Sequence, residues 1–115
     1  MHDEPSAPGL RCEIEPDRDR VIVRPMGEID LATVGAVEAP LDELWGTGFT
    51  CIVLDLRWVS FMDSTGLRLL IRQCARAEQD GAALEVNVAG DGAVHRLLHL
   101  TGLLDRLPIA VDARR

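Results

Sequence analysis

Apolar residues recur along this chain with two different periods. Residues 10–15 alternate apolar and polar side chains, which is the period of a half-buried strand, and residues 21–26 predict a second one. The short turn at residues 16–19 indicates that these two strands form an antiparallel hairpin. Residues 51–56 are almost wholly apolar, which is typical of a strand buried on both faces with helices packed above and below the sheet. Residues 84–88 predict a further strand.

Between these strands the apolar spacing changes to three and four residues. This spacing predicts amphipathic helices over residues 32–45, from near Ser64 to residue 80, and over residues 91–100. We expect Pro40 to kink or locally break the first helix. Residues 57–62 are predicted as a connecting loop. The residues predicted to share the buried face of the second helix are Leu67, Leu70, Ile71, Cys74 and Ala77.

The order of elements is strand, strand, helix, strand, helix, strand, helix. This order predicts an α/β fold whose mixed, mostly parallel sheet has an antiparallel N-terminal strand and is packed with amphipathic helices. A chain of 115 residues has room for a single domain, which we place at residues 10–110. Residues 1–9 are expected as a flexible N-terminal tail and residues 111–115 as a C-terminal tail.

The charge balance excludes several classes of function. The chain has nineteen acidic and twelve basic residues, and all of the basic ones are arginine, so the net charge is −7. This balance provides no excess of basic residues with which to bind the phosphates of a nucleic acid. The longest apolar runs are far shorter than the ~20 residues that span a bilayer, and residues 1–10 do not form a signal peptide. We therefore expect a cytoplasmic protein that binds neither nucleic acid nor membranes.

Cysteine and histidine residues give weak signals for metal or redox chemistry. Cys12, Cys51 and Cys74 are odd in number and lack C-x-x-C spacing, so we interpret them as reduced structural thiols, with a zinc or redox site as the alternative. His95 and His99 have the spacing of helical metal ligands, but no third ligand is evident. The prediction is no metal and no cofactor.

Arginine recurs every fourth residue on the second helix, at Arg68, Arg72 and Arg76. This stripe is either a solvated face balanced by nearby acids or a contact for an acidic partner. Serine, histidine and aspartate all occur, but D-S-T-G at residues 63–66 differs from the G-x-S-x-G elbow of serine hydrolases. We therefore expect a binding protein and not an enzyme.

The segment F-M-D-S-T-G-L, residues 61–67, follows a buried strand and opens a helix. Ligands and partners of such sheets gather at the carboxyl ends of the strands. The Ser64 hydroxyl is expected at the N-terminus of the helix, where unpaired backbone amides could accept the charge of a phosphate. Asp-Ser-Thr is also an ordinary helix N-cap sequence, so a purely structural role stays open.

Two blocks together resemble the STAS domain family, in particular the anti-sigma-factor antagonists of bacteria. G-E-I-D-L at residues 27–31 is similar to the G-E-L-D-x of that family. V-L-D-L at residues 53–56, followed by F-M-D-S-T-G-L at residues 61–67, is similar to its phosphorylation segment D-S-[ST]-G-L. The resemblance covers about residues 10–109. Departures are Pro25, Pro40 and the G-D-G of residues 90–92.

The resemblance implies a partner-switching mechanism of transcription regulation. The unphosphorylated antagonist binds an anti-sigma factor that is also a serine kinase, and so releases a sigma factor. Phosphorylation abolishes this binding, and a serine phosphatase restores it. Such a phosphoprotein acts as a monomer or weak dimer.

Carried over residue by residue, the resemblance makes Ser64 the phosphate acceptor, or Thr65 if the register of the match is shifted by one. The residues that it implies for partner binding are Asp30, Asp63, Ser64, Thr65, Gly66 and Arg68. The alternative is a STAS scaffold without a phosphorylation cycle, as an accessory subunit of a transporter or signalling complex.

Overall fold

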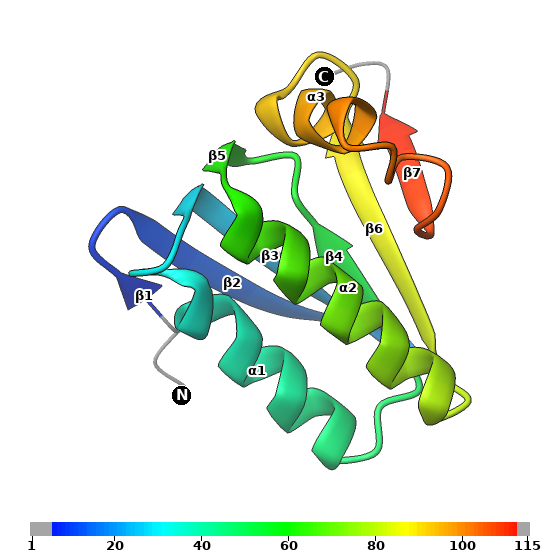
Figure 1. Ribbon diagram of the computed structural model, residues 1–115. Coiled ribbons are helices and arrows are strands. Elements are labelled where there is room, and N and C mark those ends of the chain that lie inside the picture. The colour runs from blue at the N-terminus through cyan, green and yellow to red at the C-terminus, as the bar shows by residue number, and fades with distance from the viewer. Residues whose placement is uncertain (1–5, 113–115) are drawn as a thin grey trace.

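The computed structural model describes residues 6–112, which form one mixed sheet and three helices (Figure 1). Alternating residues of the N-terminal half produce a β-hairpin, and the segments with helical spacing pack against the sheet. The strands are β1 (Ser6–Ala7), β2 (Leu10–Asp17), β3 (Arg20–Ile29), β4 (Cys51–Asp55), β5 (Val59–Met62), β6 (Ala83–Ala89) and β7 (Ile109–Asp112). The helices are α1 (Val34–Gly46), α2 (Ser64–Gln79) and α3 (Ala93–Leu100).

The sheet has the mixed, mostly parallel character predicted from the sequence. Its strand order is β1-β2-β3-β4-β6-β7, with β5 paired to β3 beside that path. The β1–β2 and β2–β3 pairs are antiparallel, whereas β3–β4, β3–β5, β4–β6 and β6–β7 are parallel. The fold-class prediction is therefore confirmed.

Strand β5 lies where a connecting loop was predicted. β4 pairs with β3 at Val21–Val23, and β5 pairs with the later part of β3 at Gly27–Ile29. Pro25 lies in the interval between these two pairings, as expected for a residue that lacks a backbone donor. The loop prediction for residues 57–62 is wrong because β5 is four residues long and buries both of its ends, so it has no alternating pattern.

Two short edge strands include residues that were predicted as tails. Ser6 and Ala7 pair with β2, and Ile109–Asp112 pairs with β6. A two-residue strand and a four-residue strand are too short to produce a readable period. The rest of the predicted tails, residues 1–5 and 113–115, lies outside the described residues.

Both long helices differ in detail from the prediction. α1 continues through Pro40 without a break, and Pro40 lies in its buried face with Val37 and Leu41. In α2 the fully buried residues include Leu69 and Gln73, neither of which was expected to be buried. The observed buried face of α2 is therefore rotated about the helix axis relative to the predicted one. Of its five residues, Leu70 and Ala77 are buried, Leu67 and Cys74 are half-buried, and Ile71 is exposed.

A buried polar contact explains the rotation of α2. The Trp45 indole N–H of α1 donates to Oε1 of Gln73 at 2.8 Å, and the Gln73 amide nitrogen donates to Oδ1 of Asp42 at 3.0 Å. Because buried polar groups are stable only when hydrogen-bonded, this pairing lets a glutamine lie between the helices. Apolar spacing alone leaves Gln73 out of the buried face.

All three helices pack on one apolar cluster. α1 and α2 lie side by side across the same face of the sheet (Figure 1). The cluster combines Val37, Leu70 and Leu98 of the three helices with strand residues such as Val23 and Leu54. The expectation of helices above and below the sheet is therefore wrong.

On the opposite face, an ion-pair network buries Asp55, which is 1% exposed. Its Oδ1 accepts from the backbone N–H and Nε of Arg57 at 3.1 and 2.9 Å, and its Oδ2 accepts from Nε of Arg24 at 3.0 Å. Arg57 also donates to Asp112 of β7 at 2.8 Å, so the network joins three strands. Burial alone would raise the pKa of Asp55, but the hydrogen bonds from Arg57 and Arg24 outweigh it and lower the pKa.

The variant Asp55→Asn tests the contribution of this network to stability. The amide removes the charge and presents a donor to two guanidinium groups, so the free energy of unfolding at pH 7 should fall by about 1–3 kcal/mol. Urea denaturation measures it. The control Asp17→Asn removes the exposed Arg20 pair, with N–O distance 3.1 Å, and should cost about 0–1 kcal/mol. Equal losses in the two variants would contradict the assigned role.

Candidate functional site

The acidic residues Asp30 and Asp63 of the two sequence motifs come together at one edge of the sheet. β3 and β5 are parallel and end at the pair Ile29 and Met62. Asp30 and Asp63 follow directly, so both carboxylates lie at the same strand ends. The Asp63 backbone N–H donates to the Ile29 carbonyl at 3.3 Å, which continues the pairing by one residue.

Asp63 is the N-cap of α2. Its backbone is extended, and its Oδ1 accepts from the Thr65 backbone N–H at 2.9 Å and from the Thr65 hydroxyl. The hydrogen bond from the Thr65 side chain lowers the pKa of Asp63, and the nearby charge of Arg68 lowers it further. Asp63 is therefore an anionic cap, and the hydroxyl of Thr65 is already engaged.

Asp30 organises the turn that leads into α1. Its Oδ1 accepts from the backbone N–H groups of Ala32 at 3.0 Å and Thr33 at 3.2 Å. The Thr33 hydroxyl is buried, donates to the Glu28 carbonyl at 2.7 Å and accepts from the Asp30 N–H at 2.9 Å. Sequence reasoning missed Thr33, although the D-x-x-T spacing at residues 30–33 is a signal for such a turn.

Ser64 is exposed at the first position of α2, directly after the N-cap Asp63. Within residues 6–112 its hydroxyl makes no hydrogen bond, in contrast to that of Thr65. The backbone N–H groups of Gly66 and Leu67 donate to the Asp63 carbonyl at 3.1 and 3.2 Å, and these hydrogen bonds hold the first turn of the helix. The site therefore presents one free hydroxyl on a rigid support.

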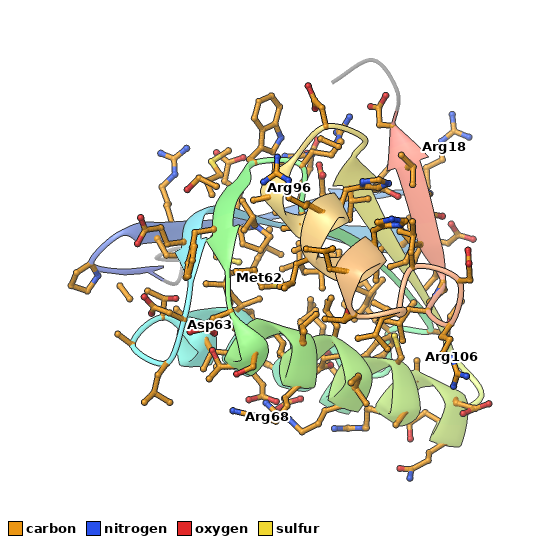
Figure 2. The ribbon with its side chains drawn as sticks, turned by 45° about the horizontal axis from the view of Figure 1, so that its top comes forward. Arg18, Met62, Asp63, Arg68, Arg96 and Arg106 are labelled. Atoms are coloured by element: carbon orange, nitrogen blue, oxygen red, sulfur yellow. The ribbon has the colours of Figure 1, made fainter. Side chains whose placement is uncertain are left out.

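Gly66 allows α2 to begin directly against β5. A Cβ at this position would overlap the side chain of Met62 and would lie 2.9 Å from its Sδ. Met62 is itself buried in the apolar cluster, so it has little room to move. Figure 2 shows Met62 and Asp63 at the point where β5 passes into α2.

The arginine stripe of α2 divides into two kinds of residue. Arg72 donates two hydrogen bonds to Glu38 of α1, at 2.9 and 3.0 Å, and Arg76 pairs with Asp80 at 3.1 Å. Arg68 is exposed and makes no ion pair within residues 6–112. Arg72 and Arg76 therefore fit the interpretation of a solvated face balanced by nearby acids. Arg68 does not, and it is the unpaired cation nearest to Ser64 along the helix.

Exposed apolar side chains flank the site. Leu31 follows Asp30 and is 80% exposed, and Phe61, two residues before Asp63, is 46% exposed. Exposed large apolar residues near polar ones are typical of protein interaction surfaces. Leu31 and Phe61 were not predicted as site residues, although both lie inside the two motif blocks.

The histidines and cysteines were the other candidates for metal or redox chemistry. His95 and His99 lie on α3, and residues 6–112 contain no cluster of three or more histidine, cysteine or acidic residues that could hold a metal. None of the three cysteines forms a disulfide. None of the three helices in this part of the chain is long and apolar enough to cross a membrane.

Comparison with known proteins identifies the family. The sequence matches the STAS domain over residues 12–113, which is most of its length. The chain belongs to the STAS domain family. Both motif blocks lie within the matched region.

Individual relatives of this STAS domain are anti-sigma factor antagonists. It is 38% identical over 78 residues to "Anti-sigma-F factor antagonist RsfB" of Mycobacterium tuberculosis, covering 67% of this chain and 62% of that relative. It is 36% identical over 101 residues to an anti-sigma F factor antagonist of Paenibacillus polymyxa, covering 87% and 86%. The crystal structure of an anti-sigma factor antagonist from Mycobacterium paratuberculosis superposes with a TM-score of 0.79 at 30% identity, covering 90% and 88%.

Replacing Gly66 by alanine tests the fit between α2 and β5. Because the added methyl group meets Met62, the STAS domain should lose about 1–3 kcal/mol of unfolding free energy in urea denaturation. Gly35 of α1 is the matched control, since a Cβ there has no neighbour within 4 Å. Gly35→Ala should stabilise the fold by about 0.4–1 kcal/mol. A neutral Gly66→Ala variant would contradict the packing described.

Proposed function

We propose that this STAS domain is an anti-sigma factor antagonist whose partner binding is switched by phosphorylation of Ser64. The observation that carries the proposal is the exposed, unengaged Ser64 hydroxyl at the start of α2. The similarity to three anti-sigma factor antagonists supports the same class of function. The domain acts by binding and not by catalysis.

The hydrogen bonds at the site favour Ser64 over Thr65 as the acceptor. The Thr65 hydroxyl donates to Asp63, so a kinase would first have to break the cap of α2 to reach it. Phosphorylation of Ser64 breaks no hydrogen bond of the described residues. Its added charge would lie at the N-terminus of a helix, where the macrodipole favours an anion. The fold is therefore expected to be retained after modification.

The group transfer needs an external kinase with bound ATP. Oγ of Ser64 attacks the γ-phosphorus, forming an O–P bond while the bond to the bridging oxygen of the β-phosphate breaks and ADP leaves. The hydroxyl proton passes to a base of the kinase or to water. A phosphatase reverses the modification by hydrolysis, in which water supplies the new oxygen of the released inorganic phosphate.

The electrostatics of the site explain how a phosphate would end binding. Asp30 and Asp63 already make this edge negative, and a phosphoserine adds about two further negative charges at pH 7. The unmodified surface offers apolar Leu31 and the cation Arg68 to a partner. A phosphate on Ser64 would have to lose its hydration when the partner binds, which costs free energy. It would also repel acidic groups of that partner.

Incubation with ATP and the cognate anti-sigma factor kinase tests the assignment. Intact mass measurement should show addition of one phosphate to the wild-type chain and none to Ser64→Ala, with Ser60→Ala as a control that is modified normally. Ser60 is an exposed serine of β5, four residues before the site. Modification of Ser64→Ala at the wild-type rate would refute Ser64 as the acceptor.

Binding of the same anti-sigma factor tests the switch. Ser64→Asp places a negative charge at the centre of the proposed surface, so affinity should fall at least about tenfold, which is about 1.4 kcal/mol. Isothermal titration calorimetry measures this, and Ser60→Asp should bind within twofold of wild type. Undiminished binding by Ser64→Asp would argue for a scaffold without a phosphorylation cycle.

A further inference from the structure

Arg68 differs from the other arginines of α2 in having no carboxylate partner. The guanidinium of Arg72 binds Glu38 through two hydrogen bonds, and that of Arg76 binds Asp80. Arg68 is exposed and unpaired within residues 6–112. A cation without a partner is available to an anion that arrives later, and Ser64 is the residue where such an anion is proposed.

The helix geometry directs Arg68 towards Ser64. The two residues are four positions apart on α2, so their side chains lie on the same face one turn from each other. Helical side chains lean towards the N-terminus, which brings the Arg68 guanidinium back towards the first turn. An anion four residues before a cation is also the favourable order of such a pair. Figure 2 shows Arg68 projecting from the N-terminal part of α2, away from the sheet.

The other charged groups near Ser64 leave Arg68 as the available cation. Asp63 is adjacent and is already bound by Thr65, Asp30 caps its own turn, and Glu28 is exposed at the end of β3. Glu38 of α1 is bound by Arg72. The charge of Arg68 lowers the pKa of Asp63, which places it within electrostatic range of this end of α2.

We propose that Arg68 pairs with the phosphate of phosphorylated Ser64 and is thereby withdrawn from the anti-sigma factor. This inference rests on the proposed phosphorylation of Ser64. In the unmodified domain, the free guanidinium binds an acidic group of the partner. In the modified domain, a charge-assisted hydrogen bond to the phosphate occupies it. The switch therefore combines added repulsion with the loss of a contact that the domain itself supplied.

Phosphorus NMR on the intact chain carrying phosphoserine at position 64 tests the pairing directly. Ordinary phosphoserine has a second pKa of about 6. An adjacent cation stabilises the dianion, so the wild-type phosphate should titrate at least about 0.3 unit below that of Arg68→Gln. Arg72→Gln, which removes the next arginine of the stripe, should titrate like wild type. The difference should shrink in ~1 M salt.

Equal phosphate pKa values in wild type and Arg68→Gln would overturn the pairing, as would equal shifts in Arg68→Gln and Arg72→Gln. Because phosphoserine is installed during synthesis of the chain, this titration needs neither kinase nor partner. A failure of the kinase to modify Ser64 would thus refute the proposed function and leave the titration result standing. Normal modification with no effect of Arg68 on the pKa would refute the pairing alone.

Affinity measurements test the withdrawal of Arg68 from the partner. Unphosphorylated Arg68→Gln should bind the anti-sigma factor about three- to tenfold more weakly than wild type, as expected for loss of one charged contact. Arg72→Gln should bind as wild type does. Wild-type affinity in Arg68→Gln would overturn this half of the proposal.

Discussion

The pairing of β5 with the outer part of β3 positions the site. β4 ends at Asp55, and the chain pairs with β3 again from Val59, as β5, farther along β3 and in the same parallel direction. This step places the ends of β3 and β5 side by side, and an aspartate directly follows each strand. α1 and α2 then begin at the same edge (Figure 1). Without β5, Asp63 and Ser64 would lie on a loop with no fixed relation to Asp30.

The two aspartates have a different role from Ser64, which directly follows Asp63. Asp30 and Asp63 use their carboxylates to accept backbone N–H groups at the starts of the helices, which makes both turns rigid. Thr65 is bound into the same cap. Ser64 is exposed and free of such contacts, so its chemistry can change while the fold around it is retained. The proposed cycle, in which a kinase, a binding partner and a phosphatase recognise one surface, benefits from this separation.

Much of the fold was predictable because its signals are local. The hairpin, the buried strand at β4 and the three helices follow from periodicity, and the D-S-T-G segment marks the start of α2. The G-E-I-D-L and D-S-T-G-L blocks also carry the family resemblance, which the match over residues 12–113 confirms. The assignment of Ser64, Asp30 and their neighbours to partner switching stays a prediction.

The remaining features depend on contacts between distant residues. β5 is recognisable only when β3 extends past β4, because its own four residues lack alternation. Gln73 is buried because Trp45 and Asp42 satisfy its amide, a pairing that no local pattern shows. The Asp55 network likewise joins side chains from three strands. The sequence does not distinguish Arg68 from Arg72 and Arg76. Only the structure shows that Arg72 binds Glu38 and Arg76 binds Asp80.

We propose that one edge of the sheet, residues 30–33 and 63–68, is the partner-binding surface. Titration of the isotope-labelled unphosphorylated chain with its anti-sigma factor, followed by amide NMR, tests it most directly. We expect the largest chemical-shift changes at residues 30–33 and 63–68, with small changes at Glu13, Arg24 and Glu85 on the face of the sheet that carries no helix of residues 6–112. Changes concentrated on that helix-free face, with residues 63–68 unaffected, would contradict it.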